Sequence, residues 1–323
     1  MTLLEQIRRP IADELTACRS YMRSRMSATD SFVQSMLDYI IDNTGKGVRP
    51  LLVVLASRLH SSEPIGERSY VAAMLVEMIH TASLVHDDVI DQSDMRRGNP
   101  SVNSKWGANS AVLCGDYILA TAFEAGMASG HYDIPTYIVG AMKDLCTGEI
   151  VQNECNRSHV IDRATYFDII NKKTAVLLAA SAAVGAIAVG VDTCSIDKMY
   201  RFGRALGMAF QIKDDLLDYD LSAATGKPTF NDLKEGKITL PLLCVIEGDA
   251  ALRERCIGLI DNGSDESLHE VYDIVVGQGG LAASERIMDD FMAEARAIVA
   301  SYPEGEIRAS MEALCEFVAQ RNN

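Results

Sequence analysis

The sequence predicts an all-α protein: a single large helical domain, residues 1–323, with long helices around a common centre. Three observations predict this fold class. Apolar residues recur at spacings of three and four, strand-like alternation bounded by hairpin turns is hard to find, and no linker rich in proline, glycine and serine divides the chain. With 48% hydrophobic residues, a chain of 323 residues buries a large core.

The expected helices follow one another with breakers between them. Residues 1–15 mix both charge signs with apolar side chains and predict an amphipathic helix. Helical periodicity predicts further helices over Leu51–His60, Tyr70–Val85, Ala111–Met127, Tyr200–Leu217 and Ala282–Val299. Residues 174–191 carry no charge and consist mostly of alanine, valine and glycine, which indicates a core helix rather than a membrane span. Turn residues interrupt the periodicity at 44–47, 98–100, 226–228 and 262–264.

Charge and cysteine content limit the possible functions. The net charge of −15 argues against a nucleic-acid binder, because phosphate contacts need a basic surface. A small anionic substrate remains possible, since a local basic pocket or bound metal ions can reverse the field. Eight scattered cysteines without a CxxC pair, together with an N-terminus that lacks a secretory leader, predict reduced thiols in a cytoplasmic protein without a transmembrane segment.

Two aspartate clusters carry the chemistry. Both read DDxxD: Asp87, Asp88 and Asp91 follow one apolar helix, and Asp214, Asp215 and Asp218 follow another. The first and last aspartates of each cluster, at i and i+4, share a helix face, where their repulsion is unfavourable unless a cation offsets it. Mg²⁺ is typically held by one or two carboxylates together with substrate phosphate oxygens.

Two simpler interpretations remain open for each cluster, a solvated acidic helix face and a structural ion-pair network. The presence of two copies, each joined to a core-like helix, argues against a merely solvated face. A calcium loop is excluded, because neither stretch has the alternating oxygen ligands and central glycine of such loops.

Basic residues lie beside glycine turns or beside the aspartate clusters. Each alone is typical of a surface charge, but together they favour an anion site, and adjacent arginines offer planar forks to phosphate oxygens. Lys173 and Thr174 are expected to open the small-residue helix, so that its N-terminal amides and a cation point at an anion. The other candidates are Lys46, Arg49, Arg96, Arg97, Lys227 and Lys237.

The motifs occur in an order that resembles the trans-isoprenyl diphosphate synthases, also called polyprenyl synthetases. The resemblance runs from about residue 45 to residue 241 and rests on GKGVRP, EMIHTASLVHDDVIDQSDMRRG, FQIKDDLLDYD and GKPTFNDLKEGKITLP. One DDxxD alone is weak evidence, whereas this ordered set is specific. Phe230 departs from the pattern, because relatives often have glycine there, which leaves the local loop conformation in question.

The resemblance implies an all-α fold with helices surrounding a deep central cavity, and a homodimer. It implies a reaction that joins an allylic diphosphate to isopentenyl diphosphate, head to tail and with trans geometry. It implies Mg²⁺ ligands at Asp87, Asp88, Asp91, Asp214 and Asp218. It implies that the allylic diphosphate is neutralised by Arg96, Lys173, Lys227 and Lys237, and that isopentenyl diphosphate binds at Lys46, Arg49, His80 and Arg97. Asp215, Gln211 and Thr174 would line or support the catalytic centre. His86 is expected to contact residues of the site rather than the substrate.

The chemistry explains this set of residues. Ionisation of an allylic C–O bond creates a carbocation and a highly charged diphosphate, whose developing charge metal ions and fixed cations stabilise. The double bond of the second substrate then attacks, which needs alignment and exclusion of water. In the family picture the released diphosphate takes the proton.

Residues before the first cluster predict the product length. Ala82 and Ser83 stand five and four residues before Asp87, where bulky aromatics in the family stop the chain at short products. Small residues predict a product longer than farnesyl, in the range of quinone side chains, with a deeper floor at Phe123 or Met127. The alternatives are a short-chain synthase, in which Ala82 and Ser83 only allow tight helix packing, a terpene cyclase, and a non-catalytic synthase subunit. The intact second DDxxD argues against the last two.

Overall fold

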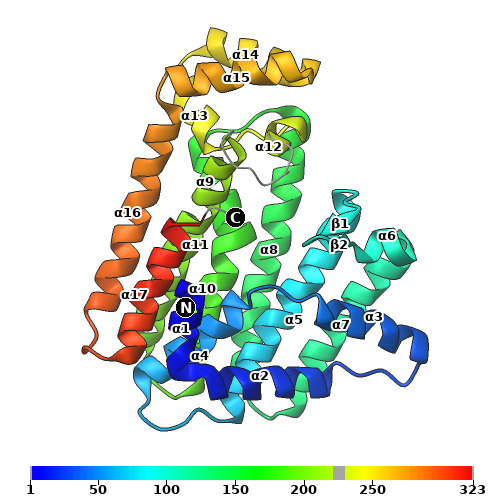
Figure 1. Ribbon diagram of the computed structural model, residues 1–323, viewed down its shortest axis with the longest axis vertical. Coiled ribbons are helices and arrows are strands. Elements are labelled where there is room, and N and C mark those ends of the chain that lie inside the picture. The colour runs from blue at the N-terminus through cyan, green and yellow to red at the C-terminus, as the bar shows by residue number, and fades with distance from the viewer. Residues whose placement is uncertain (1, 221–229, 322–323) are drawn as a thin grey trace. The chain divides into compact units, whose positions relative to one another are not determined.

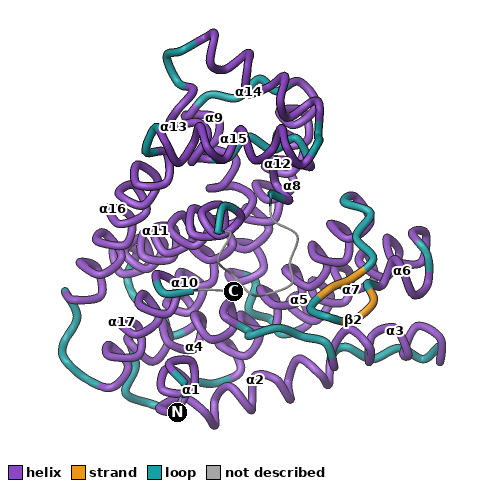
Figure 2. Tube along the Cα trace, turned by 45° about the horizontal axis from the view of Figure 1, so that its top comes forward, coloured by secondary structure: helices purple, strands orange, loops and turns teal. Residues whose placement is uncertain are grey.

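The computed structural model describes residues 2–220 and 230–321, and the chain divides into two compact units (Figure 1). Unit 1 comprises residues 1–142, 177–200 and 304–311, and unit 2 comprises residues 143–176, 201–303 and 312–323. Helices form almost all of the regular structure (Figure 2), which confirms the all-α prediction. One domain around a central cavity stays a prediction, and the two units are described in turn.

Unit 1 contains the N-terminal helices and a small hairpin. The helices are α1 (Leu3–Arg8), α2 (Ala12–Arg25), α3 (Ser31–Asp42), α4 (Val48–His60), α5 (Glu67–Ile90), α6 (Val102–Trp106) and α7 (Ala108–Ala128), and strands β1 (Met95–Arg96) and β2 (Asn99–Pro100) pair antiparallel between α5 and α6. The single helix predicted for residues 1–15 is broken. Pro10, which lacks an amide hydrogen, lies in a 3₁₀ turn (Arg9–Ile11) that separates α1 from α2.

The remaining helices belong to unit 2 or are divided between the two units. They are α8 (Asp133–Ser158), α9 (Arg163–Ile170), a π-helical turn (Asn171–Ala175), α10 (Val176–Ala188), α11 (Thr193–Asp218), α12 (Asn231–Lys234), α13 (Leu240–Ile246), α14 (Ala250–Asn262), α15 (Asp265–Gly277), α16 (Gly280–Ala300) and α17 (Glu306–Ala319). Helices α8, α10, α11 and α17 contribute residues to both units. The turn predicted at 262–264 is confirmed: Gly263 takes a left-handed conformation after α14, and the Ser264 side chain caps α15.

Small residues on α7 bring it close to α5. A Cβ atom at Gly115 would overlap the His86 ring, and one at Gly126 would lie 3.2 Å from Leu75 Cδ1. The two helices therefore run side by side (Figure 1), and this packing fixes the position of α5. The C-terminal end of α5 carries the first aspartate cluster.

Two helical segments have the length and composition of a membrane span, Ala108–Ala128 and Arg163–Ala188. Of the apolar window in the second, 78% is buried. Because a core helix passes the same composition test, this burial supports the core-helix prediction for the small-residue segment. In the first segment only 39% of the apolar window is buried, so much of its apolar surface is exposed.

Candidate active site

The first aspartate cluster lies at the C-terminal end of α5. Asp87 and Asp88 are in its last turn, which the structure describes in full and which contains no basic residue, and Asp91 is the C-cap. A helix C-terminus carries unpaired carbonyl groups and a partial negative charge, so carboxylates there are destabilised. The arrangement therefore favours a bound cation.

Asp88 and Arg96 form a buried ion pair in unit 1. The Asp88 side chain is only 4% exposed, and its Oδ1 accepts a hydrogen bond of 2.8 Å from Arg96 Nε and a second, shorter one from Nη2. The hairpin of β1 and β2 positions Arg96 for this contact. The pair neutralises one carboxylate of the cluster, while the metal role of Asp88 and the diphosphate role of Arg96 stay predictions.

Arg97 lies against the backbone of the segment between α3 and α4. Its Nη1 donates to the Asn43 carbonyl at 3.1 Å, and a Cβ atom at Gly45 would stand 2.5 Å from its guanidinium carbon. Only glycine at position 45 leaves room for this packing. Arg97 itself takes a left-handed φ of 54°, which the turn of the hairpin imposes.

The residues predicted to bind isopentenyl diphosphate gather in unit 1. Burial lowers the pKa of the Arg49 guanidinium to about 10, and burial followed by the charges of Arg49 and Arg97 lowers the pKa of His80 well below its usual value. His80 is therefore a neutral imidazole at physiological pH, able to donate a hydrogen bond but not a charge. Lys46 is exposed, and its carbonyl accepts a hydrogen bond from Arg8.

The second aspartate cluster repeats the helix-end arrangement in unit 2. Asp215 and Asp218 occupy the last turn of α11, which is described throughout and again contains no basic residue, and Asp214 lies directly before this turn. Asp214 Oδ1 lies 2.8 Å from Nη1 of Arg321, whose guanidinium stacks 4.1 Å from the centre of the Phe210 ring. Arg321 was not predicted, because nothing in its local sequence links it to α11.

Asp215 belongs to a buried polar network. Its Oδ2 accepts a hydrogen bond of 2.6 Å from the Tyr166 hydroxyl, and its Oδ1 accepts one of 3.0 Å from Gln211 Nε2. Gln211 Oε1 in turn accepts from the Thr174 hydroxyl at 2.7 Å. Burial, followed by the charge of Asp232, raises the pKa of Asp215 to about 7. Hydrogen bonds therefore connect the three predicted residues Asp215, Gln211 and Thr174 with one another.

Asp218 caps the short helix α12. Its two oxygens accept from the amides of Asn231 and Asp232 at 3.0 and 3.1 Å, and burial raises its pKa. Phe230, just before α12, takes the left-handed conformation (φ 62°) that glycine adopts readily, and it is buried against His269 and Tyr272. Aromatic packing therefore accompanies the strained backbone at this departure from the family pattern.

Lys173 does not lie at a helix N-terminus, and the prediction of free amides there is wrong. Residues 171–175 form a π-helical turn that continues α9 into α10, so the backbone stays within the helix. Lys173 Nζ instead lies 2.7 Å from Glu149 and donates to Gln152 Oε1 at 2.9 Å. Gly148 allows this approach, because a Cβ there would lie 2.8 Å from the Lys173 amide.

A cavity of about 80 Å³ in unit 2 collects many of the predicted residues. Its lining includes the predicted residues Lys173, Thr174, Gln211, Asp215 and Lys237. It also includes Gln152, Tyr166 and Asp232, which were not predicted as site residues. Lys237 Nζ lies 3.8 Å from Asp232 and pairs with Glu235. Lys227 lies outside the described residues.

The residues predicted to control product length differ in exposure. Ala82 is fully buried on α5, and the Ser83 hydroxyl donates to the His80 carbonyl at 2.9 Å. On α7, Phe123 is half-buried and Met127 is 52% exposed. Their role in setting product length stays a prediction.

A divalent metal ion needs several oxygen, nitrogen or sulfur ligands close together. Among residues 2–220 and 230–321, no three histidine, cysteine, aspartate or glutamate side chains form a ready metal site. Mg²⁺ suits such a chain, because it commonly takes one or two carboxylates and completes its shell with water and phosphate oxygens. Asp87, Asp88 and Asp91 in unit 1, and Asp214 and Asp218 in unit 2, stay predicted as its ligands.

These features, two acidic helix ends and partly buried guanidinium and lysine side chains in an all-α chain, indicate a class of protein suited to metal ions and diphosphates. The chain belongs to the polyprenyl synthetase family, whose model matches residues 30–275. It is 31% identical to the octaprenyl diphosphate synthase of Escherichia coli, over 99% of both chains, and 31% identical to the nonaprenyl diphosphate synthase of Mycobacterium tuberculosis, over 93% of this chain and 90% of that one.

Solved structures agree with this assignment. A decaprenyl diphosphate synthase from Rhodobacter capsulatus superposes with a TM-score of 0.92 at 31% identity and covers 99% of each chain. A polyprenyl synthase from Caulobacter crescentus, complexed with calcium and isoprenyl diphosphate, gives a TM-score of 0.89 at 31% identity over 99% of this chain and 98% of that one. The predicted family and the isoprenoid synthase fold class are therefore confirmed.

Proposed function

We propose that this protein is a trans-polyprenyl diphosphate synthase, a prenyltransferase that condenses an allylic diphosphate with isopentenyl diphosphate. The observation that carries the proposal is the pair of DDxxD clusters, each at a helix C-terminus whose last turn lacks a basic residue. Such helix ends favour cations. Membership of the polyprenyl synthetase family supplies the reaction.

The charge of each side chain determines whether it would bind the metal ion or a diphosphate. Asp87, Asp91 and Asp214 would hold Mg²⁺, and the ion would stabilise the negative charge on the departing allylic diphosphate. Arg49, Arg97 and neutral His80 bind isopentenyl diphosphate, with His80 donating a hydrogen bond rather than a charge. The C–O bond of the allylic diphosphate breaks, the double bond of isopentenyl diphosphate forms the new C–C bond, and the released diphosphate accepts the proton that is lost.

The product is longer than farnesyl diphosphate and serves as a quinone side-chain precursor. Small, buried Ala82 before the first cluster supports this, and so do relatives named octaprenyl and nonaprenyl diphosphate synthase. A short-chain product is the alternative, since a relative from Methanothermobacter thermautotrophicus, 31% identical over 93% of this chain and 95% of its own, is named a short chain isoprenyl diphosphate synthase.

The direct test is incubation of the purified chain with labelled isopentenyl diphosphate, farnesyl diphosphate and Mg²⁺, followed by chromatography of the products. We expect consumption of isopentenyl diphosphate, products longer than farnesyl, and loss of activity when a chelator removes the metal. Cyclised farnesyl without consumption of isopentenyl diphosphate would indicate a terpene cyclase. No reaction at all would indicate a non-catalytic subunit.

The protein acts as a homodimer, and α7 supplies the interface. Its exposed face is mainly apolar: Val112, Leu113, Tyr117 and Met127 are 39, 68, 36 and 52% exposed. Exposed apolar side chains that gather on one helix are typical of a subunit contact. A relative from Bacillus subtilis, 33% identical over 88% of this chain and 81% of its own, is named component 2 of a heptaprenyl diphosphate synthase, so a different partner chain is the alternative.

Leu113→Glu is expected to convert the dimer into a monomer, because a buried unpaired carboxylate opposes association. Light scattering coupled to size-exclusion chromatography measures the mass, 35.2 kDa for one chain. Val276→Glu, at an exposed apolar residue of α15, is the matched control and should remain dimeric. A wild-type protein that elutes as a monomer, or a dimeric Leu113→Glu variant, contradicts this interface.

The protein resides in the cytoplasm. All eight cysteines are free thiols, which suits a reducing compartment.

A further inference from the structure

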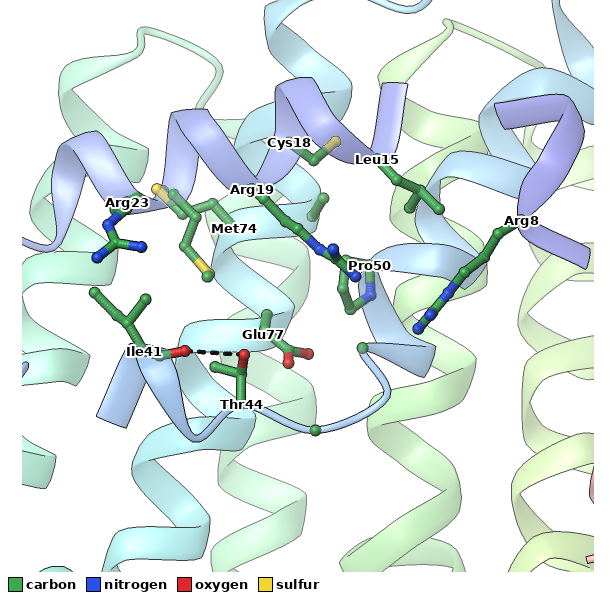
Figure 3. A pocket seen from close by; sticks show the side chains of 14 residues that line it. Arg8, Leu15, Cys18, Arg19, Arg23, Ile41, Thr44, Pro50, Met74 and Glu77 are labelled. Carbon is green, nitrogen blue, oxygen red and sulfur yellow. Dashed lines mark hydrogen bonds between the residues drawn. The ribbon is translucent and has the colours of Figure 1, made fainter. Parts of the chain in front are cut away.

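A cavity of about 370 Å³ lies in unit 1, on the α2 side of the segment that joins α3 to α4. It is several times larger than the cavity that holds Asp215 and Lys173. Figure 3 shows the side chains of Arg8, Arg19 and Glu77 directed into it from α1, α2 and α5. The four residues assigned to isopentenyl diphosphate (Lys46, Arg49, His80 and Arg97) are not part of its lining.

Glu77 is a buried carboxylate with an unused oxygen. Its side chain lines the cavity, the residue is only 7% exposed, and its Oε2 has no hydrogen-bond partner among the described residues. The nearby charges of Arg49, Arg97 and Arg19 favour its ionised form, although burial opposes it and raises its pKa. An unsatisfied buried polar atom of this kind is costly, so a ligand that donates a hydrogen bond would stabilise it.

The cations of the cavity are placed for an anion. Arg8 is half-buried, with its Nε atom unpaired, and the neighbouring charge of Arg19 adds to the burial that lowers its pKa. A shared anion offsets the repulsion between the two guanidinium groups. Their planar N–H donors also match the oxygens of a phosphate group. Leu15, Met22 and Met74 provide an apolar wall beside them.

We propose that this cavity is a second anion site that binds the diphosphate group, either inorganic or as the head of an isoprenyl diphosphate. Arg8 and Arg19 bind its oxygens. A protonated diphosphate oxygen donates to Glu77 Oε2. The volume lies near the lower end for small-molecule sites and suits a short ligand.

A consequence follows for catalysis, and this step rests on the proposed function. Arg8 also donates to the carbonyl of Lys46, so the cavity and the isopentenyl diphosphate site share one backbone segment. An anion in the cavity reduces the positive potential beside that site and therefore weakens the binding of isopentenyl diphosphate there. Inorganic diphosphate is therefore expected to raise the KM for isopentenyl diphosphate, and Arg19→Ala to diminish this effect.

Calorimetric titration tests binding without any turnover. Inorganic diphosphate is added to the full-length protein in the presence of a chelator, so that metal-dependent binding does not contribute. All comparisons use a Lys46→Ala background, which weakens the isopentenyl diphosphate site. In this background we expect one bound diphosphate, with an affinity at least about tenfold lower after Arg19→Ala. Arg19 is exposed, so its replacement leaves the core intact.

Arg25→Ala is the matched control, because Arg25 belongs to the same helix but does not line the cavity. The same titration with isopentenyl diphosphate separates the two sources: tighter binding than that of inorganic diphosphate assigns the site to the isoprenyl ligand, and the reverse assigns it to the free anion. The proposal is overturned if Lys46→Ala alone abolishes binding of both probes, or if Arg19→Ala and Arg25→Ala bind equally well. An inactive enzyme that still binds diphosphate here would leave this site standing and reject only the proposed function.

Discussion

Asp87→Ala and Asp214→Ala are each expected to lower turnover about a thousandfold, which corresponds to about 4 kcal/mol of lost transition-state stabilisation. Each change removes a carboxylate from a helix C-terminus where a bound Mg²⁺ would offset both the acidic side chains and the helix dipole. Without it, less of the charge on the departing diphosphate is stabilised. Asp87 is half-buried and the Asp214 side chain is 35% exposed, so the helix content should stay native.

The measurement is steady-state turnover over a range of Mg²⁺ concentrations, with circular dichroism to follow the fold. We expect the Mg²⁺ concentration for half-maximal activity to rise in both variants, because a ligand is missing. Asp289→Ala, at an exposed aspartate of α16, is the control for loss of one negative charge and should behave like the wild type. Near-normal turnover and an unchanged Mg²⁺ dependence in both cluster variants would remove the metal role.

Asp214 also pairs with Arg321, so the fold control is needed for its variant, and three of the other aspartates have structural contacts of their own. Asp88 neutralises Arg96, Asp215 accepts from Tyr166, and Asp218 caps α12. Replacing any of them leaves buried donors without an acceptor, so a loss of activity would mix chemistry with stability.

The helices themselves were predictable from spacing. The periodic segment Tyr70–Val85 lies inside α5, and residues 200–217 lie inside α11. Periodicity identified the buried middle of each helix, whereas the ends depend on single residues such as Gly66, which precedes α5. The two-residue strands β1 and β2 are too short for any alternation to be visible.

The site was predictable as a set of residue types but not as a set of contacts. The i, i+4 spacing places the carboxylates on a common helix face. Which oxygens remain for a metal depends on partners far along the chain: Tyr166 lies 49 residues from Asp215. Lys173 shows the same limit, because small residues after it suggested a helix start, whereas the π-helical turn that joins α9 to α10 comes from packing.

Ala82→Phe is expected to shorten the products markedly, from chains longer than farnesyl toward farnesyl itself. Ala82 is fully buried and lies one heptad after Leu75 and four residues before His86, the two side chains that meet the glycines of α7. All three therefore share the face of α5 that packs on α7. A phenyl ring here would fill the space along α5 that the growing hydrocarbon is proposed to occupy.

Two measurements distinguish whether Ala82 lines a tunnel for the product or only allows tight helix packing. Chromatography of the products from labelled isopentenyl diphosphate gives the chain length, and thermal unfolding gives the stability. If Ala82 only allows tight helix packing, the larger side chain costs about 1–3 kcal/mol of stability and leaves the products alone. Ala82→Ser, which keeps the side chain small, should retain long products. A folded Ala82→Phe enzyme with the wild-type product distribution would show that position 82 does not limit chain growth.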